Sequence, residues 1–247
     1  MDEGKDGLYE YIAVYVDDLT IAAKNPKEIC DALTGKYNYK LKGVGPLTYH
    51  LGCNFERDED GTLRAGPRKY IDKMMSWYEH TYGTQPKQAS SPLEKGDHPE
   101  VDDSEFTDDE GIKQYQAMIG QLQWLIALGR IDVFTATMSM SRWRACPRIG
   151  HLNRLKRIYG YVAKMKHGYI RIRTEEPDYS HIPDPGYDWK HTVYGDVKEM
   201  LPPDAPKPLG KPVVTTTYVD ANLYHDVITG RSVVSYSITT SAKQDTH

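Results

Sequence analysis

The sequence predicts an α+β fold, and three observations support this class. Apolar and β-branched residues surround a polar pair within residues 9–23, which is typical of a β-hairpin. Apolar residues then recur at helical spacing in several segments of the middle of the chain. Two further β-rich runs follow near the carboxyl end, at residues 218–222 and 230–236. Strands and helices that occupy separate stretches of a chain are typical of α+β proteins.

The polar pair at the predicted hairpin tip consists of Asp17 and Asp18. A rigid hairpin can hold carboxylate oxygens for a hard cation such as Mg²⁺ without the entropic cost of ordering a loop. Aspartate is also common in plain turns, which is the structural alternative. The flanking residues favour the metal site, because apolar side chains at a tip need a covering partner. These flanking residues are Tyr15, Val16 and Leu19.

The elements expected next are a helix, two strands and a second helix. Asn25 caps the predicted first helix, Pro26 takes its first position, and Glu28 complements the dipole in its first turn. The strands surround Gly52, where glycine permits either a bulge or a close backbone approach. The second helix begins at Arg68 and carries one apolar stripe that predicts core packing, made of Ile71, Met74, Met75 and Tyr78.

Charge is strongly segregated along the later part of the chain, although the formal net charge is only −4. Residues 94–110 hold nine acids and one lysine, and we expect them to form a flexible connector. Residues 133–174 hold ten Lys and Arg, interleaved with aromatic residues, and no acid. Such a mixture suits phosphate neutralisation and base stacking on a nucleic acid. The alternative is the solvated face of a helix whose apolar stripe includes Leu155, Ile158 and Val162.

Length and composition limit the remaining possibilities. A chain of 247 residues with 39% hydrophobic content can form about two domains. No run of the sequence has the pattern of a signal peptide or a membrane span, so we expect neither. Cys30, Cys53 and Cys146 are too few and too scattered for a zinc site or a disulfide framework, so we expect a reducing compartment. Eight of the fifteen prolines fall between Pro177 and Pro212 and predict a stiff linker.

The run Tyr15-Val16-Asp17-Asp18-Leu19 resembles the Tyr-x-Asp-Asp motif of reverse transcriptases, and most closely the copia-type retrotransposon enzymes. Further segments resemble that family in the expected order, at residues 39–52, 68–78, 115–125, 130–133, 140–158 and 218–236. Three positions depart from the family pattern. Gly43 and Asn222 stand where relatives have Asp, and the family's Arg-Pro-Asp has lost its proline at Ile131.

The resemblance implies a division of the α+β chain into four parts. Residues 1–66 would be a partial polymerase palm sheet with the hairpin, and residues 67–173 a helical thumb and connection that includes the acidic loop 94–110. Residues 174–212 would be the proline-rich linker, and residues 213–247 the first strands of a ribonuclease H-like domain.

The resemblance also implies the site residues and the cofactor. Asp17 and Asp18 would be catalytic and would bind Mg²⁺, with Mn²⁺ as the alternative ion, and Asp220 would be the first metal ligand of the ribonuclease H site. The residues expected near the primer and nucleotide are Tyr15, Val16, Lys42, Leu51 and Gly52, although Lys42 also suits a solvated surface. The residues expected to bind nucleic acid are Arg142, Arg144, Arg154, Lys156, Arg157, Lys164 and Lys166.

The function implied is that of a reverse transcriptase fragment. Its partners would be an RNA or DNA template-primer and deoxynucleoside triphosphates, with no membrane, and the rest of the polyprotein would be encoded upstream and downstream. The location would be the cytoplasm, in virus-like particles, with the nucleus as the alternative. Only sixteen residues precede Asp17, so the strand with the family's third carboxylate is not expected here, and we expect the isolated chain to be inactive. The alternatives are a nucleic-acid-binding protein without catalysis and the product of a decayed element.

Overall fold

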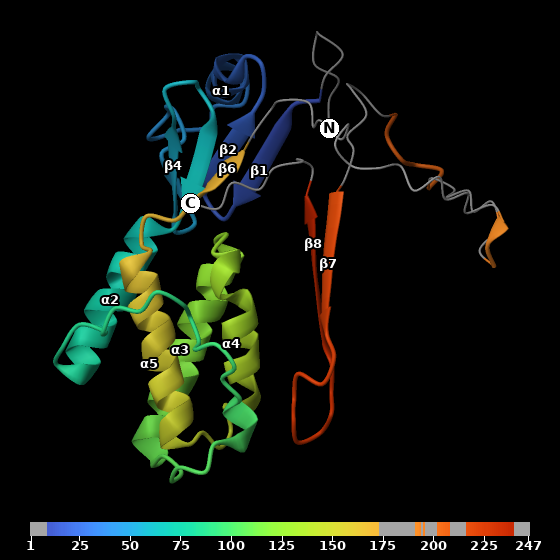
Figure 1. Cartoon of the computed structure of the whole chain (residues 1–247). Coiled ribbons are helices and arrows are strands. Elements are labelled where there is room, and N and C mark those ends of the chain that lie inside the picture. The colour runs from blue at the N-terminus through green and yellow to red at the C-terminus, as the bar shows by residue number, and fades with distance from the viewer. Residues whose placement is uncertain (1–8, 173–190, 194, 196–201, 208–215, 240–247) are drawn as a thin grey trace. The chain divides into compact units, whose positions relative to one another are not determined.

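The computed structural model describes residues 9–172, 191–193, 195, 202–207 and 216–239 (Figure 1). Its internal contacts divide the chain into two units. The described part of unit 1 consists of residues 9–47 and the short pieces between 191 and 207. The described part of unit 2 consists of residues 48–172 and 216–239. The proline-rich linker predicted for residues 174–212 lies largely outside the described residues.

Unit 1 contains the predicted hairpin and the helix that follows it. Strands β1 (Tyr11–Tyr15) and β2 (Asp18–Ala22) pair in an antiparallel sheet, and α1 spans Pro26–Gly35. Asn25 precedes α1 as predicted, but its side chain does not cap the helix backbone, because its amide donates instead to Glu28 Oε1 at 2.7 Å. None of the described residues of unit 1 is buried, so the described part of this unit has no core.

Unit 2 begins with a four-stranded antiparallel sheet in the order β3-β4-β5-β6. The strands are β3 (Tyr49–His50), β4 (Cys53–Arg57), β5 (Leu63–Gly66) and β6 (Ile170–Ile172). Strand β6 lies far along the chain and pairs with β5, with Ala65 opposite Ile170. This pairing joins residues 48–66 to the segment that follows the later helices, so both belong to the same unit.

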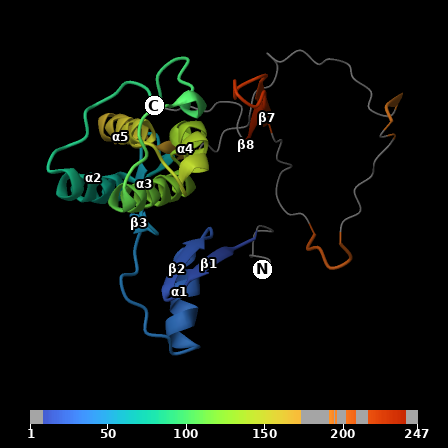
Figure 2. The same cartoon turned by 90° about the horizontal axis from the view of Figure 1, so that it is seen from below.

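Four helices pack beside one another in unit 2 and form its core (Figure 2). They are α2 (Arg68–Tyr82), α3 (Asp109–Ala127), α4 (Phe134–Met140) and α5 (Ile149–Lys164), with 3₁₀ turns at Pro99–Val101, Ile131–Val133 and Ser141–Trp143. The apolar stripe predicted on α2 is confirmed, because all four of its members are buried. The core continues through side chains of the other helices, including Tyr115, Met118, Leu122, Leu155, Ile158 and Tyr159.

The last described element is a long hairpin, as the sequence predicted. Strands β7 (Thr216–Asn222) and β8 (Val233–Thr239) pair over their full length. The buried Asp226, in the loop between them, accepts backbone hydrogen bonds from Ile228 and Thr229. Its carboxylate also binds the Arg142 guanidinium at 2.5 Å, so the loop contacts the helical part of the same unit. Across the described residues, every helix is too short or too polar to cross a bilayer.

Candidate functional site

The paired aspartates lie at the tip of the first hairpin. Tyr15 and Asp18 form the last cross-strand pair, so Val16 and Asp17 are the two central residues of a two-residue turn. Val16 has a φ of +54°, a left-handed conformation that a β-branched residue rarely adopts. Hairpin turns with positive φ at the first central position usually place glycine there. The turn therefore holds Val16 under backbone strain, next to the two carboxylates.

Cross-strand pairing determines which face of the hairpin carries Asp18. Opposite residues in an antiparallel pair share a face, and successive residues alternate between faces. Asp18 therefore shares its face with Ala13 and Thr20, whereas Val14 and Leu19 lie on the other face. Asp17 and Asp18 are both exposed, so their oxygens are accessible to an ion or a ligand.

Two exposed carboxylates fit one kind of magnesium site. Mg²⁺ in nucleotide-handling enzymes is commonly held by one or two carboxylates together with substrate phosphates and water, rather than by a complete protein cage. The Asp17 and Asp18 oxygens match this donor set. Within the residues that the structure describes, no group of three or more His, Cys, Asp or Glu could enclose a metal. These two aspartates can therefore supply part of a metal's ligands but not all of them.

The remaining residues predicted near the primer fall in both units. Lys42 is exposed in unit 1, and among the described residues no hydrogen bond or ion pair joins it to either aspartate. Leu51 and Gly52 form the two-residue turn between β3 and β4 in unit 2, with φ values of +49° and +93°. The sequence predicted that Gly52 permits a close approach to its backbone. A Cβ at Gly52 would lie 3.2 Å from Leu128 Cδ1, so the group that approaches this glycine is the Leu128 side chain.

Asp220 lies in the middle of β7, opposite Ser235. Its side chain is exposed. Among the described residues, Asp220 belongs to no group of three or more His, Cys, Asp or Glu that could hold a metal. Its assignment as a metal ligand thus stays a prediction.

The structure changes the interpretation of the basic tract. Residues 87–105, called the strap below, run against α5 and neutralise its two arginines, Arg154 and Arg157. Arg154 donates to both oxygens of Asp97 and also binds Asp102. Arg157 donates to Glu94 at 3.0 Å. The expectation that the acidic segment is a flexible connector is therefore wrong, because opposite charges hold it against the helix.

The other predicted nucleic-acid-binding residues also have partners, with one exception. Arg142 binds Asp226, Lys164 donates to Ser90, and the Lys166 ammonium lies 3.7 Å from Asp72. The Lys156 ammonium lies over the Tyr82 ring, and burial lowers its pKa. Among the described contacts, only the Arg144 guanidinium has no polar or aromatic partner, and it is exposed. The tract is thus largely satisfied within the protein.

Backbone packing brings the strap close to α5. Gly150 and Gly160 face it, and a Cβ at Gly160 would lie 1.9 Å from the carbonyl oxygen of Lys87. The buried His151 accepts from the Arg148 backbone N–H through Nδ1, and its Nε2 lies 2.9 Å from the Pro99 carbonyl. Burial lowers the pKa of His151 and outweighs the opposing hydrogen bond to Pro99.

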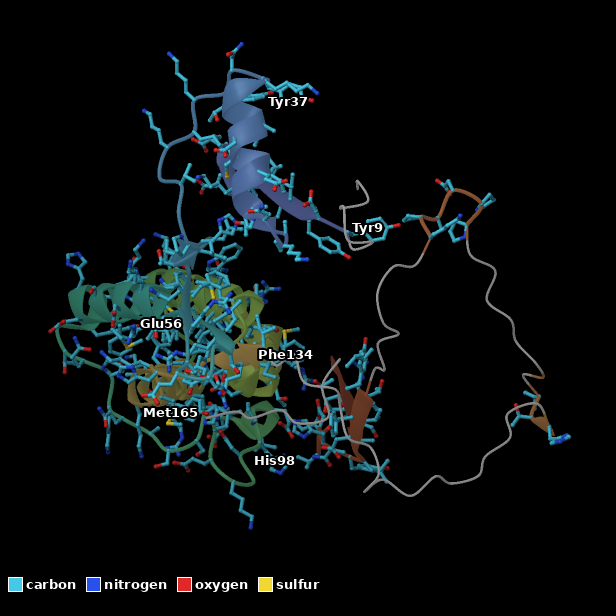
Figure 3. All side chains as sticks on the ribbon, turned by 90° about the horizontal axis from the view of Figure 1, so that it is seen from above. Tyr9, Tyr37, Glu56, His98, Phe134 and Met165 are labelled. Carbon is cyan, nitrogen blue, oxygen red and sulfur yellow. The ribbon has the colours of Figure 1, made fainter. Side chains whose placement is uncertain are left out.

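A small pocket with a cationic lining was not predicted from the sequence. It lies between the β4-β5 pair, the start of α2 and the segment after α5 (Figure 3, where Glu56 is labelled). Arg64, Arg68 and Lys166 line it, with Glu56 as its one acid. Arg64 and Arg68 had no local signal beyond their charge, because the strand pairing that brings them beside Lys166 is not visible in the sequence.

A second missed group is the ion pair between the buried Arg130 and the more exposed Asp132. Arg130 donates to both oxygens of Asp132, at 2.9 and 2.7 Å. Burial raises the pKa of Asp132, but the contacts with Arg130 outweigh this effect and hold the pKa below its usual range. The pair lies in the Arg-Ile-Asp segment that the sequence comparison had singled out only as a family motif. It stabilises the turn after α3.

Comparison with known proteins finds relatives among transposon proteins. The chain is 32% identical to the putative transposon Ty5-1 protein of Saccharomyces cerevisiae over 185 residues, which cover 70% of this chain and 57% of that protein. It is 29% and 28% identical to the retrovirus-related Pol polyproteins from transposons RE1 and RE2 of Arabidopsis thaliana, over 62% of this chain and 10% of each polyprotein.

The chain thus spans little more than half of the yeast relative and a small part of the plant polyproteins. No protein-family model and no solved structure matches it. The resemblance to copia-type retrotransposon proteins that was inferred from the sequence is nevertheless confirmed by these relatives. The chain is similar to the proteins of such retrotransposons over part of their length.

Proposed function

We propose that this chain carries part of the polymerase site of a reverse transcriptase, which would synthesise DNA on an RNA or DNA template-primer. The observation that carries the proposal is the hairpin turn that presents Asp17 and Asp18 side by side, next to a strained Val16. Relatives described as retrovirus-related Pol polyproteins support it. In this assignment residues 1–66 are palm, residues 67–173 with α2 to α5 are the thumb and connection, and β7 and β8 begin a ribonuclease H-like domain.

Each residue of the turn has a distinct task in this proposal. Asp17 and Asp18 bind Mg²⁺ through their carboxylate oxygens, and the ion, when bound, stabilises the attacking and leaving oxygens of phosphoryl transfer. Val16 lies first in the turn and is 84% exposed, so it is available to contact a primer end or nucleotide. Tyr15 pairs with Asp18 across the hairpin and limits the positions that Asp18 can take.

The test is Mg²⁺-dependent primer extension on an RNA template. Because no third acidic side chain joins Asp17 and Asp18 among the described residues, the chain is fused behind the segment that precedes the matched region in the RE1 Pol polyprotein. We expect incorporation of deoxynucleotides that falls by at least ~100-fold in Asp17→Asn, since removing a metal ligand removes charge stabilisation from the transition state.

Asp31→Asn is the matched control, because Asp31 is an exposed aspartate on α1 of the same unit. Its activity should equal that of the unsubstituted fusion. Activity that survives in Asp17→Asn, or that falls equally in both variants, would contradict the proposal.

A further inference from the structure

The strap neutralises arginines of α5, so a ligand of unit 2 would have to bind cations elsewhere. The arginines of α5 that face it are paired with acids of the same chain. The pocket between β4, β5, α2 and the segment after α5 is different, because three cationic side chains line it with one carboxylate. Its neutral lining consists of Asn54, Gly66, His167, Gly168 and Tyr169.

The single acid of the pocket organises two of its cations. Glu56 Oε2 accepts from Arg64 at 2.5 Å, and Glu56 Oε1 accepts from Arg68 at 2.6 Å. Arg64 is further held by Asp58 and lies over the Tyr169 ring, so its position is well determined. The bond to Glu56 uses one of the five N–H donors of Arg68. Two guanidiniums are thus positioned by one carboxylate, and donors remain for a ligand.

Lys166 and Asn54 add donors to the same pocket. The Lys166 ammonium is 3.7 Å from Asp72, which is beyond hydrogen-bond distance, and both side chains are substantially exposed. An ion pair of this kind contributes little and is easily replaced. The Asn54 Oδ1 accepts from the Lys69 backbone N–H, so its other amide atom, the NH₂ group, is the one left to donate.

The size of the pocket limits what can enter. Its volume is about 110 Å³, well below the roughly 300–1,000 Å³ of sites for drug-sized molecules. Gly66 keeps it open, since a Cβ there would lie 3.0 Å from the Gly168 carbonyl oxygen. A small anion with several acceptor oxygens therefore fits the donors better than a whole nucleotide does.

We propose that this pocket binds a backbone phosphate of a nucleic acid, through Arg68 and Lys166 with Arg64 as a fixed charge. This assignment rests on the proposed function, which supplies the polymer. It differs from the basic surface predicted along α5, because it uses residues of four separated segments, and Lys166 is the one residue that both share. Free inorganic phosphate could bind through the same donors, and the experiment below distinguishes it from a backbone phosphate.

The test measures binding of a short fluorescent DNA duplex to the full chain, by anisotropy, between about 50 and 200 mM salt. In Arg68→Gln/Lys166→Gln, we expect binding roughly tenfold weaker at low salt, because charge-assisted hydrogen bonds are lost. The slope of log K against log salt should also become shallower by about 1, as for one lost phosphate contact. The control is Lys73→Gln/Lys113→Gln, which removes the same charge from exposed sites on α2 and α3 outside the pocket.

Equal changes in the two double variants would overturn the proposal, because net charge alone would then explain them. So would the absence of duplex binding by the unsubstituted chain. Inorganic phosphate is titrated against chloride and followed by ³¹P NMR. If phosphate binds more tightly than chloride, and the pocket variant loses this binding but still binds the duplex normally, the pocket is a site for free phosphate. That result would also overturn the proposal. Lys166→Gln alone keeps the test valid if the double variant does not fold, since the half-exposed Lys166 ammonium makes no hydrogen bond within the part of the chain that the structure describes. None of these readouts requires polymerase activity, so the proposal can fail while the proposed function stands.

Discussion

Arg154 of α5 binds Asp97 of the strap through three hydrogen bonds of 2.8 to 3.0 Å. Both side chains are largely buried, at 21% and 14% exposure. Such a pair fixes one segment against another, because separating the partners would leave a charge in a poorly solvated place. The contact thus explains why an acidic segment and a basic helix that the sequence separates form one structure.

Replacing one partner of this pair should destabilise unit 2 strongly. In Arg154→Gln the carboxylates of Asp97 and Asp102 lose their charged partner, and we expect the free energy of unfolding to fall by about 3 kcal/mol. Urea denaturation followed by circular dichroism measures this. Arg157→Gln is the control, because its partner Glu94 is 70% exposed and the loss should stay below about 1 kcal/mol. Equal losses would show that burial of the Arg154 pair contributes nothing.

The packing of the strap also predicts opposite effects for two glycine substitutions. In Gly160→Ala the new methyl group would overlap the Lys87 carbonyl oxygen, and displacing backbone should cost about 2 to 3 kcal/mol. Gly120→Ala on α3 meets no atom within 4 Å, so the better helix propensity of alanine should stabilise the protein by up to ~1 kcal/mol. Urea unfolding of both variants gives the comparison. A stabilising Gly160→Ala would mean that the strap does not lie on α5 in solution.

The pH dependence of stability should reflect His151. Its pKa is lowered in the folded state, so the unfolded chain takes up this proton first as pH falls. The contribution of neutral His151 is therefore complete above its ordinary value of 6.5 and is lost as pH falls through the lower folded pKa. We expect the free energy of unfolding to decrease below pH ~6.5 and this decrease to shrink in His151→Gln.

NMR titration gives a direct check on the same residue. The ring signal of His151 should titrate below the ordinary histidine value of about 6.5. A His151 midpoint at or above that value would contradict the geometry, in which protonated Nδ1 would face the Arg148 backbone N–H.

The strained turn at Val16 predicts that a substitution there can stabilise the first hairpin, whatever its effect on function. Val16→Gly removes the side chain that disfavours a φ of +54°, and we expect the hairpin to become more stable by about 1 kcal/mol. Hydrogen exchange of the β1 and β2 amides measures the local effect. Val14→Gly, in the paired part of β1, should instead weaken the hairpin. Faster exchange in Val16→Gly would show that the turn is not strained.

Much of the fold could be predicted from the sequence because its signals are local. The alternation around Asp17 and Asp18 gave the first hairpin, and helical spacing gave the buried stripe of α2. The order of the motifs also indicated the resemblance to retrotransposon proteins, which the relatives confirm. Each of these features depends on residues that are close in the sequence or on their order along it.

Only the tertiary structure decided which distant segments meet. The pairing of β6 with β5 brings Lys166 beside Arg64 and Arg68, and no local pattern predicts that pairing. The strap was equally invisible, because a run of charge does not reveal which opposite charges will neutralise it. The sequence by itself determined the hairpin, the helices and the resemblance to retrotransposon proteins, since these follow from short-range preferences and residue order. The structure determined which cations remain available to a ligand, since that depends on the packing of segments far apart in the chain.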